Sequence, residues 1–531
     1  MKYLYIILFI LLWLPAKPQS GMQVFNDNIL HEIRISINLT HWYDSIIADY
    51  NNHRDDPDNY PEISRPCILE FDGVKLDTIG IRQRGNSSNI INSVKFKKPF
   101  KLEINVFKNI KLDGLKNLNL NNCTDDPSFV REAICYKLIR DLGLLAPRTS
   151  YAKVYINAQY WGLYLMVENV DKTFLKDHYG GNANNGNLYK TAQTGQAYLN
   201  PMDTADSLYK DNSGLELKTN NSADDWSKLN HFIYIINNPN NVGFKDSLNK
   251  LFDVKAYLTL LALEELVFSW DSYWANGNNY YLYEHPDGTI RWISWDMNET
   301  FPNKHGFDLS KLVGANYLLP TNHYDDRPLI KAIFSVEEWK NQYYDIVCSI
   351  LNKQFRVEYI DTTILRWHQL IDEAVYNDTN ELYSYDDFDG SLMGNKVSAD
   401  LTFPRTGFRL KRNLPGIIPF VHEQRDWAGD QIDLLGHTCI FADPSNLKYQ
   451  LYIFPNPSFQ NTLNISWLAE ADGLARIQLI NAAGKLVIDL YNQSASNNKL
   501  QTEIESIPAG IYWVLKIDAN GSMGSGKCVK F

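Results

Sequence analysis

The amino-acid sequence predicts an α+β protein that carries a small all-β domain at its C-terminal end. Three observations lead to this fold class. Alternating apolar and polar runs joined by short turns recur between residues 31 and 295, as in β-hairpins. Two apolar segments between these runs have the length and termination signals of helices. After residue 447, several short alternating runs are separated by turn residues, which is typical of a β-sandwich.

The first part of the chain combines strands with one helix. Asp125-Asp126-Pro127 and Gly143 are start and stop signals for a helix over residues 128–142, and its apolar stripe predicts packing into the core. The surrounding runs alternate as strands, and two of them close a hairpin at Asp72-Gly73. The predicted strands are 31–38, 67–71, 74–84, 151–157 and 160–168.

A second hairpin is predicted farther along, after an apolar helix over residues 254–268. Its strands are 279–284 and 289–295, and Pro286-Asp287-Gly288 supplies the tight turn. Pairing counted back from this turn sets Asn278 and Asn279 opposite Trp295 and Asp296.

The open end of this hairpin gathers residues suited to phosphoryl transfer from Mg-ATP. Asp271 lies on a polar loop just before the hairpin, Asn279 opens one strand and Asp296 closes the next. One carboxylate is needed to orient the attacking hydroxyl, and two hard oxygen ligands are needed to hold Mg²⁺. We therefore expect Asp271 in the first role, and Asn279 and Asp296 in the second.

The same residues resemble the CotH kinase family, named for a spore-coat protein H. Further matching blocks are GIRQRGNSS (80–88), KKPFKLEIN (97–105), the stretch 118–175 and GNLYK (186–190). They occur in family order, and the resemblance covers most of residues 30–430. It implies an atypical protein-kinase-like fold that phosphorylates secreted proteins, with Asp271 as the catalytic aspartate and Asn279 and Asp296 as magnesium ligands.

Two departures from the family pattern affect the expected metal site. The spacing from Asp271 to Asn279 is longer than the usual family loop, which leaves Asn278 as a competing ligand. Many relatives have a second carboxylate two residues after the metal-binding aspartate, where this chain has Asn298. Weaker magnesium binding is expected, and a pseudokinase or a non-catalytic cell-envelope binding protein is the alternative function.

Candidate phosphate ligands lie near the Gly85 loop. Arg82 and Arg84 fall on one strand face just before Asn86 and Ser87, whose amide and hydroxyl suit phosphate oxygens. Lys98 and Lys101 could add positive charge, although the run Lys95, Lys97 and Lys98 also fits a solvated edge, and a solvated turn explains RGNSS equally well.

Glu168 and Lys190 are a candidate ion pair for steadying the nucleotide phosphates. Glu168 ends a buried-looking strand, where an unpaired carboxylate would be costly, so a basic partner is expected. Lys190 closes GNLYK after a Gly- and Asn-rich stretch. A structural ion pair is the alternative interpretation.

Composition and termini indicate export. Residues 1–20 have the layout of a secretory signal, and a signal anchor is the alternative interpretation. The apolar run is too short to span a bilayer comfortably, so no stable transmembrane segment is expected after removal of the signal. The net charge of −11 argues against a nucleic-acid partner. Six scattered cysteines without a CxxC pair predict neither a zinc site nor a dense disulfide framework, and buried free thiols are one interpretation.

The tail resembles the type A sorting domain of the type IX secretion system, through FPNPSFQNTLNISW, IQLINAAGKLV, IPAGIYWVLKI and the closing GKCVKF. The resemblance implies a Bacteroidetes-type cell, type IX secretion machinery as a partner, and passage through the periplasm to the cell surface or medium. A carbohydrate-binding or adhesive β-sandwich is the alternative. The expected organisation is a signal peptide (1–20), a kinase-like catalytic domain (21–443) and the sorting domain (447–531). The expected activity is transfer of the ATP γ-phosphate to Ser or Thr of an exported or surface protein.

Overall fold

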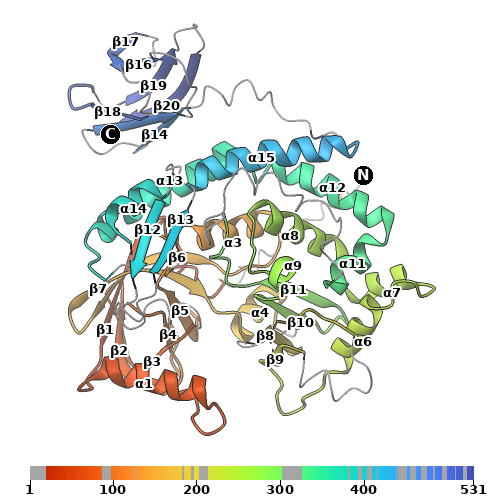
Figure 1. Cartoon of the computed structure of the whole chain (residues 1–531). Coiled ribbons are helices and arrows are strands. Elements are labelled where there is room, and N and C mark those ends of the chain that lie inside the picture. The colour runs from red at the N-terminus through yellow and green to blue at the C-terminus, as the bar shows by residue number, and fades with distance from the viewer. Residues whose placement is uncertain are drawn as a thin grey trace, which may run out of the picture.

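The computed structural model confirms the α+β class. It describes residues 19–85, 97–124, 126–181, 184–192, 196–201, 213–301, 326–380, 383–392, 397–402, 409–414, 416–437 and 439, and in the tail 451–454, 462–467, 475–481, 485–492, 499–508, 510–517 and 523–530. The proposed signal peptide lies almost wholly outside these residues. Figure 1 shows the main body, with helices above two groups of strands, and the separate strands of the tail.

A closed barrel occupies the N-terminal region. Its strands are β1 Leu30–Ser36, β2 Arg65–Phe71, β3 Val74–Gln83, β4 Phe100–Glu103, β5 Asn117–Asn121, β6 Thr149–Ile156 and β7 Gln159–Glu168. Their order is β1-β2-β3-β4-β5-β7-β6, and the parallel pairing of β1 with β6 closes the ring. The alternation seen in the sequence points one apolar face of each strand inward, where Ile33, Leu69, Ile81 and Leu102 are fully buried.

Helix α3 (Arg131–Asp141) connects β5 to β6 and is buried along most of its length. The predicted packing of this segment into the core is therefore confirmed. The helix begins three residues later than expected, because the Asp126 carboxylate accepts hydrogen bonds from the backbone N–H groups of Ser128 (2.9 Å) and Arg131 (2.8 Å) and so holds the preceding residues in a turn.

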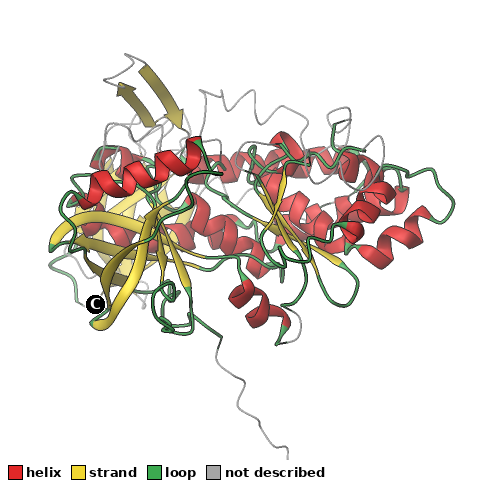
Figure 2. Ribbon diagram, turned by 90° about the horizontal axis from the view of Figure 1, so that it is seen from below, coloured by secondary structure: helices red, strands yellow, loops and turns green. Residues whose placement is uncertain are grey.

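A second sheet lies beside the barrel (Figure 2). It contains β8 Leu188–Thr191, β9 Leu215–Leu217, β10 Tyr280–Glu284 and β11 Ile290–Ser294, in the order β11-β10-β8-β9. The predicted hairpin is β10–β11, and its register is confirmed: Tyr280 pairs with Ser294, and the Trp295 N–H donates to the Asn279 carbonyl at 3.0 Å.

Helices surround this second sheet and form the larger of the two hydrophobic cores in the body. The predicted apolar helix is α8 (Val254–Leu266), which packs against α12 and α3. The other helices are α1 Trp42–Asp55, α4 Lys172–Tyr179, α6 Ser227–Ile236, α7 Phe244–Leu251, α9 Tyr273–Asn276, α11 Pro328–Phe334, α12 Glu337–Asn352, α13 Val357–Tyr376, α14 Tyr385–Gly390 and α15 Ile417–Leu434. A two-stranded sheet pairs β12 (Val397–Thr402) with β13 (Arg409–Leu414).

The cysteines are divided between one disulfide and free thiols. Cys348 of α12 is bonded to Cys439, which follows α15. Cys67, Cys135 and Cys528 are buried thiols, and Cys123 is a half-buried thiol. The expectation of mainly buried free thiols therefore describes three of the six.

The tail forms the two-layered β-structure expected from its pattern. One sheet has the order β14-β15-β18 and the other β17-β16-β19-β20. Apolar residues from both sheets, among them Ile465 and Val514, share one buried core. The strands are β14 Leu451–Phe454, β15 Thr462–Trp467, β16 Ala475–Asn481, β17 Leu486–Asn492, β18 Lys499–Glu503, β19 Gly510–Ile517 and β20 Met523–Lys530.

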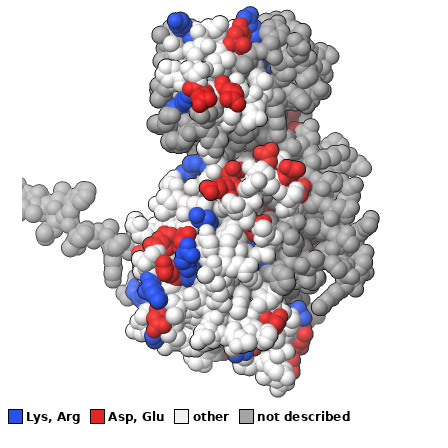
Figure 3. Space-filling model, turned by 90° about the vertical axis from the view of Figure 1, so that its left-hand side faces the viewer, with Lys and Arg blue, Asp and Glu red and all other residues white. Residues whose placement is uncertain are grey.

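The surface and helices add two observations. Among the described residues on the face drawn in Figure 3, acidic and basic side chains are interspersed and form no continuous basic stripe. No helix in the described part of the chain is both long and apolar enough to cross a membrane.

Candidate functional site

A cavity of about 1080 Å³ is bordered by the barrel, helix α3, the second sheet and the loops at the open end of the β10–β11 hairpin. This volume is slightly above the usual range for small-molecule sites, so it is large enough for a nucleotide. Most of the residues expected from the sequence line this cavity: Arg82, Arg84, Lys101, Lys190, Asp271, Asn278, Asn279, Asp296 and Asn298. Asn86 and Ser87 lie outside the described residues.

Asp271 lies on the loop between α8 and α9, and asparagine amides hold its carboxylate. Oδ1 accepts a hydrogen bond from Asn276 Nδ2, and Oδ2 accepts one from Asn279 Nδ2 at 2.8 Å. Only the nitrogen of an amide can donate to a carboxylate, so the Asn279 Oδ1 points away from Asp271. Asn279 thus makes the contact with Asp271, while Asn278 lines the same cavity.

The open end of the hairpin has an unusual backbone conformation. Asn279 (φ 57°) and Asp296 (φ 54°) both adopt the left-handed region, which Asn and Asp tolerate better than most residues. The two residues stand at the points where β10 begins and β11 has ended. The chain therefore leaves the ladder at both positions, and their side chains border the cavity.

Glu264 of helix α8 contacts the end of the hairpin strand β11. It is a buried residue of α8, and its Oε1 accepts a hydrogen bond from the Ser294 hydroxyl at 2.5 Å. Burial raises the pKa of Glu264 to about 7, although hydrogen bonds to Ser294 and Ser272 oppose the rise. Glu264 thus contacts the neighbours of both Asp271 and Trp295.

Helix α3 forms the wall next to Asp296. The backbone N–H of Asp296 donates to the Tyr136 hydroxyl at 2.9 Å. Glu132, one turn earlier on the helix, lines the cavity, and its Oε2 accepts a hydrogen bond from Asn121 Nδ2 at 2.7 Å. Burial raises the pKa of Glu132 above its usual value, and the negative charge of the nearby Asp296 adds to the rise. Two carboxylates therefore stand close together in the cavity wall.

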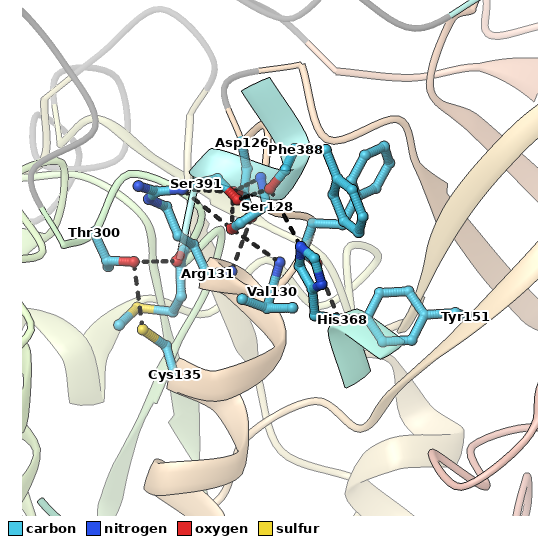
Figure 4. Close-up of polar contacts among 12 residues, drawn as sticks. Asp126, Ser128, Val130, Arg131, Cys135, Tyr151, Thr300, His368, Phe388 and Ser391 are labelled. Atoms are coloured by element: carbon cyan, nitrogen blue, oxygen red, sulfur yellow. Dashed lines mark hydrogen bonds and ion pairs between the residues drawn. The ribbon is translucent and has the colours of Figure 1, made fainter. Parts of the chain in front are cut away.

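Buried polar contacts fix the position of α3 (Figure 4). Arg131 Nη1 donates to Asp126 Oδ1 at 2.7 Å and to the Ser128 hydroxyl at 3.1 Å. On the side of the helix that faces the hairpin, the Cys135 thiol donates to the Thr300 hydroxyl at 3.4 Å. The helix is therefore attached both to its own N-terminal turn and to the segment that follows Asp296.

Two cations lie close to the indole ring of Trp295. The Arg84 guanidinium lies 5.7 Å and the Lys190 ammonium 5.6 Å from the ring centroid of Trp295. The pKa of Lys190 is lowered to about 8, mainly by burial and to a smaller extent by the positive charge of Arg84. Such a pair of partly desolvated cations is well suited to phosphate oxygens.

Arg82 and Lys101 also line the cavity but have carboxylate neighbours. Arg82 Nη1 lies 2.8 Å from Glu62, and Arg82 Nε lies 3.3 Å from Glu103. Lys101 Nζ lies 3.4 Å from Glu103 as well. Their positive charge is therefore largely balanced within the protein.

The predicted pairing of Glu168 with Lys190 is wrong. Glu168 forms an ion pair with Arg148 and accepts hydrogen bonds from its Nε (2.9 Å) and backbone N–H (3.1 Å). Arg148 immediately precedes β6, which pairs with β7, so hairpin formation itself brings the two residues together.

The interpretation of Lys97 and Lys98 as a solvated edge is also wrong. Both are buried, and Lys97 Nζ lies 2.6 Å from the buried Asp378 carboxylate. Neither lysine is among the residues that line the cavity, so the expected phosphate contact of Lys98 gains no support from the structure. Burial lowers the pKa of Lys98 to about 8.

The donor set fits a magnesium ion that is shared with a phosphate ligand. Within the described ranges, no group of three or more His, Cys, Asp and Glu side chains is arranged to hold a metal by itself. Mg²⁺ commonly takes only one or two carboxylates from a protein and completes its shell with waters and phosphate oxygens. Asp296 and the Asn279 amide carry hard oxygen donors of this kind, so they are the residues that would hold the ion.

Sequence reasoning missed Glu132, Asn121 and Tyr136. Glu132 and Tyr136 lie four residues apart, on one face of a helix that the apolar stripe assigned to the core. An acidic residue inside such a buried helix was the available signal.

Comparison with known proteins supports both parts of the chain. Residues 81–427 match the family model described as CotH kinase protein, and residues 452–530 match that of the secretion system C-terminal sorting domain. The inner spore coat protein H of Bacillus subtilis is 26% identical over 335 residues, which cover 61% of this chain and 84% of that protein. Invasin CotH2 of Rhizopus delemar is 24% identical over 201 residues, which cover 36% of this chain and 33% of the invasin. Both resemblances drawn from the sequence are therefore confirmed.

Proposed function

Because the chain belongs to the CotH kinase family, we propose that it is an exported atypical protein kinase that transfers the γ-phosphate of ATP to Ser or Thr hydroxyls of secreted or surface proteins. The main support is that one cavity is lined by Asp271, Asn279 and Asp296 together with the cations Arg84 and Lys190. Phosphoryl transfer depends mainly on positioning and charge neutralisation, and these residues could provide both. We further propose that the barrel and the second sheet correspond to the two lobes of a kinase-like fold.

In this proposal Asp271 orients the acceptor hydroxyl and accepts its proton. The amides of Asn276 and Asn279 restrict rotation of its carboxylate, so the carboxylate is already positioned before the substrate arrives. Such positioning lowers the entropic cost of aligning the hydroxyl with the phosphate.

The nucleotide phosphates would lie between cations and metal ligands. Asn279 Oδ1 and the Asp296 carboxylate would hold Mg²⁺, which when bound neutralises charge on the phosphate oxygens. Arg84 and Lys190 would contact the phosphates from the Trp295 side. We assign Arg82 and Lys101 a smaller part because Glu103 lies close to both.

A nucleotide-binding protein without transfer activity is the second candidate function. It is favoured by Asn298, which stands where many family members have a second metal-binding carboxylate. An amide oxygen carries no net charge and holds Mg²⁺ less strongly than a carboxylate.

The tail indicates where the protein acts. A secretion-system sorting domain implies export to the cell surface or outside. We propose that residues 1–20 are a signal peptide, that 21–443 form the catalytic part, and that 447–531 are recognised by the type IX secretion machinery and removed after export.

Asp271→Asn in the full-length protein tests the catalytic proposal. The substitution preserves size but removes the proton acceptor, so transfer of labelled γ-phosphate should fall by about 10²-fold or more. Nucleotide affinity and the unfolding temperature should change little. Asp430→Asn is the control, because it makes the same chemical change at an exposed position of α15. Unaltered turnover in the Asp271 variant would remove this residue from the mechanism, and magnesium-dependent nucleotide binding without any transfer would favour the second function.

A further inference from the structure

Glu132 has an unused acceptor in the cavity wall. Glu132 is only 5% exposed, and its Oε2 accepts a hydrogen bond from the amide of Asn121. The Tyr136 hydroxyl also interacts with this carboxylate and opposes the rise of its pKa, but within the part of the chain that the structure describes the buried Oε1 is in no contact with full hydrogen-bond geometry. Because a buried carboxylate oxygen without a partner is costly, this position favours the arrival of a cation or a proton.

Contacts of helix α3 hold Glu132 close to Asp296. Tyr136 follows Glu132 by one helical turn on the same face of α3, and its hydroxyl accepts the hydrogen bond from the Asp296 backbone N–H. The thiol of Cys135 donates a hydrogen bond to the hydroxyl of Thr300, which lies four residues after Asp296 in the segment that follows β11. These contacts hold α3 against the residues that follow β11, and both carboxylates line the same cavity.

The amide of Asn121 also sets the orientation of Glu132. Arg84 Nη1 donates to Asn121 Oδ1, so the opposite end of this amide, Nδ2, is the end that donates to Glu132 Oε2. Oε2 is thereby kept engaged on the barrel side. Oε1 is left as the oxygen that can serve as a single ligand.

We propose that Glu132 is a ligand of the divalent cation and shares it with Asp296, so that the second carboxylate of the metal site comes from helix α3 instead of position 298. This inference rests on the proposed function, because it concerns the metal that accompanies the nucleotide. A divalent cation between the two carboxylates removes their mutual repulsion and occupies the unpartnered Oε1. Although this chain has asparagine at position 298, the site would then still have two anionic ligands, Glu132 and Asp296.

A shared proton is the competing explanation, and Glu132→Gln separates the two. Glutamine imitates a protonated glutamate in size and retains the oxygen that accepts from Asn121, but it cannot supply a second negative ligand. Binding of Mn²⁺ to the full-length protein is measured without nucleotide, from the loss of the free-ion signal in electron paramagnetic resonance. If Glu132 is a ligand, the affinity for Mn²⁺ should fall about 10-fold or more.

Glu284→Gln is the matched control. Glu284 is 7% exposed, ends β10 at the far end of the hairpin and accepts a hydrogen bond from the Tyr189 hydroxyl at 3.0 Å. It is not among the residues that line the cavity. Its replacement makes the same chemical change at a comparable burial and should leave the Mn²⁺ affinity unchanged.

Glu132→Asp gives a second test if the glutamine variant fails to fold. Aspartate keeps the charge but withdraws the oxygen by one methylene, so a smaller loss of Mn²⁺ affinity and an altered spectrum of the bound ion are expected. A folded Glu132→Gln variant that binds Mn²⁺ as well as the wild type, or a folded Glu132→Asp variant with unchanged affinity and spectrum, would overturn the inference while the kinase proposal stands. A wild-type protein that binds neither Mn²⁺ nor nucleotide would contradict both.

Discussion

Replacing Glu264 by Gln should change how the stability of the protein depends on pH. Glu264 is 4% exposed, and its Oε1 accepts a hydrogen bond from Ser294 beneath the candidate site. Burial raises its pKa from 4.5 to about 7. The folded protein therefore keeps a proton on Glu264 at pH values where the unfolded chain has released it.

The size of the effect follows from this pKa difference. Each pH unit in which only the folded state holds the proton lowers the free energy of unfolding by about 1.4 kcal/mol as the pH rises. The loss begins near pH 4.5, is complete above about pH 7 and totals about 3 kcal/mol, of which about 2.5 kcal/mol falls between pH 5 and pH 8. Glutamine does not titrate, so the variant should gain this amount relative to the wild type over the same interval.

Scanning calorimetry of the full-length proteins at pH 5 and pH 8 measures the effect. The difference in Tm between variant and wild type should be a few degrees larger at pH 8 than at pH 5. Glu216→Gln, which replaces an exposed carboxylate of β9, should show no such change with pH. Equal Tm differences at the two pH values for Glu264→Gln would refute the reasoning, because Glu264 would then ionise alike in the folded and unfolded states.

Three further outcomes are expected. Asp296→Ala should abolish magnesium-dependent nucleotide binding and Asn298→Asp should preserve or tighten it, since the first removes and the second adds a hard anionic ligand. Titration calorimetry with and without magnesium checks both, and equal affinities throughout would contradict a metal-bridged site. Lys97→Met should lower the free energy of unfolding by about 3–5 kcal/mol, because the buried Asp378 carboxylate, now 2.6 Å from Lys97 Nζ, would lose its cation. Urea denaturation measures this loss, and adding Asp378→Asn should recover part of it if the uncompensated charge is the cause. Removal of residues 444–531 should leave a soluble protein with unchanged nucleotide affinity that accumulates in the periplasm of the native cell. An intact C-terminus on the exported protein, found by mass spectrometry, would contradict removal of the tail.

Much of the candidate site could be predicted from the sequence because its key residues are close along the chain. The turn at Pro286-Asp287-Gly288 and the alternation of the flanking strands determine the pairing register of the hairpin. That register places Asn279 and Asp296 at its open end, and the polar loop after α8 brings Asp271 beside them. Most strands of the barrel and of the tail could be predicted for the same reason, since an alternating pattern indicates which face is buried, but the short barrel strands β4 and β5 were not predicted.

Contacts between distant segments depended on the tertiary structure. Lys97 and Asp378 form a buried ion pair across 281 positions of the chain, and nothing in the local pattern around Lys97 distinguishes such a pair from a solvated edge. The prediction for Glu168 failed for a similar reason. Its partner is Arg148, which precedes the neighbouring strand β6, and the local sequence does not show which basic residue lies beside it.

Helix α3 shows most clearly why contacts between distant segments cannot be predicted from local sequence. Its own sequence determines that it is a helix and that it is buried. Which residues surround Glu132, however, depends on how the helix packs between the barrel and the segment after β11, and so on Asn121, Asp296 and Thr300 from other elements. Local patterns determine which face of an element is buried, whereas the partners that meet at that face, and the charge they create together, are decided by packing.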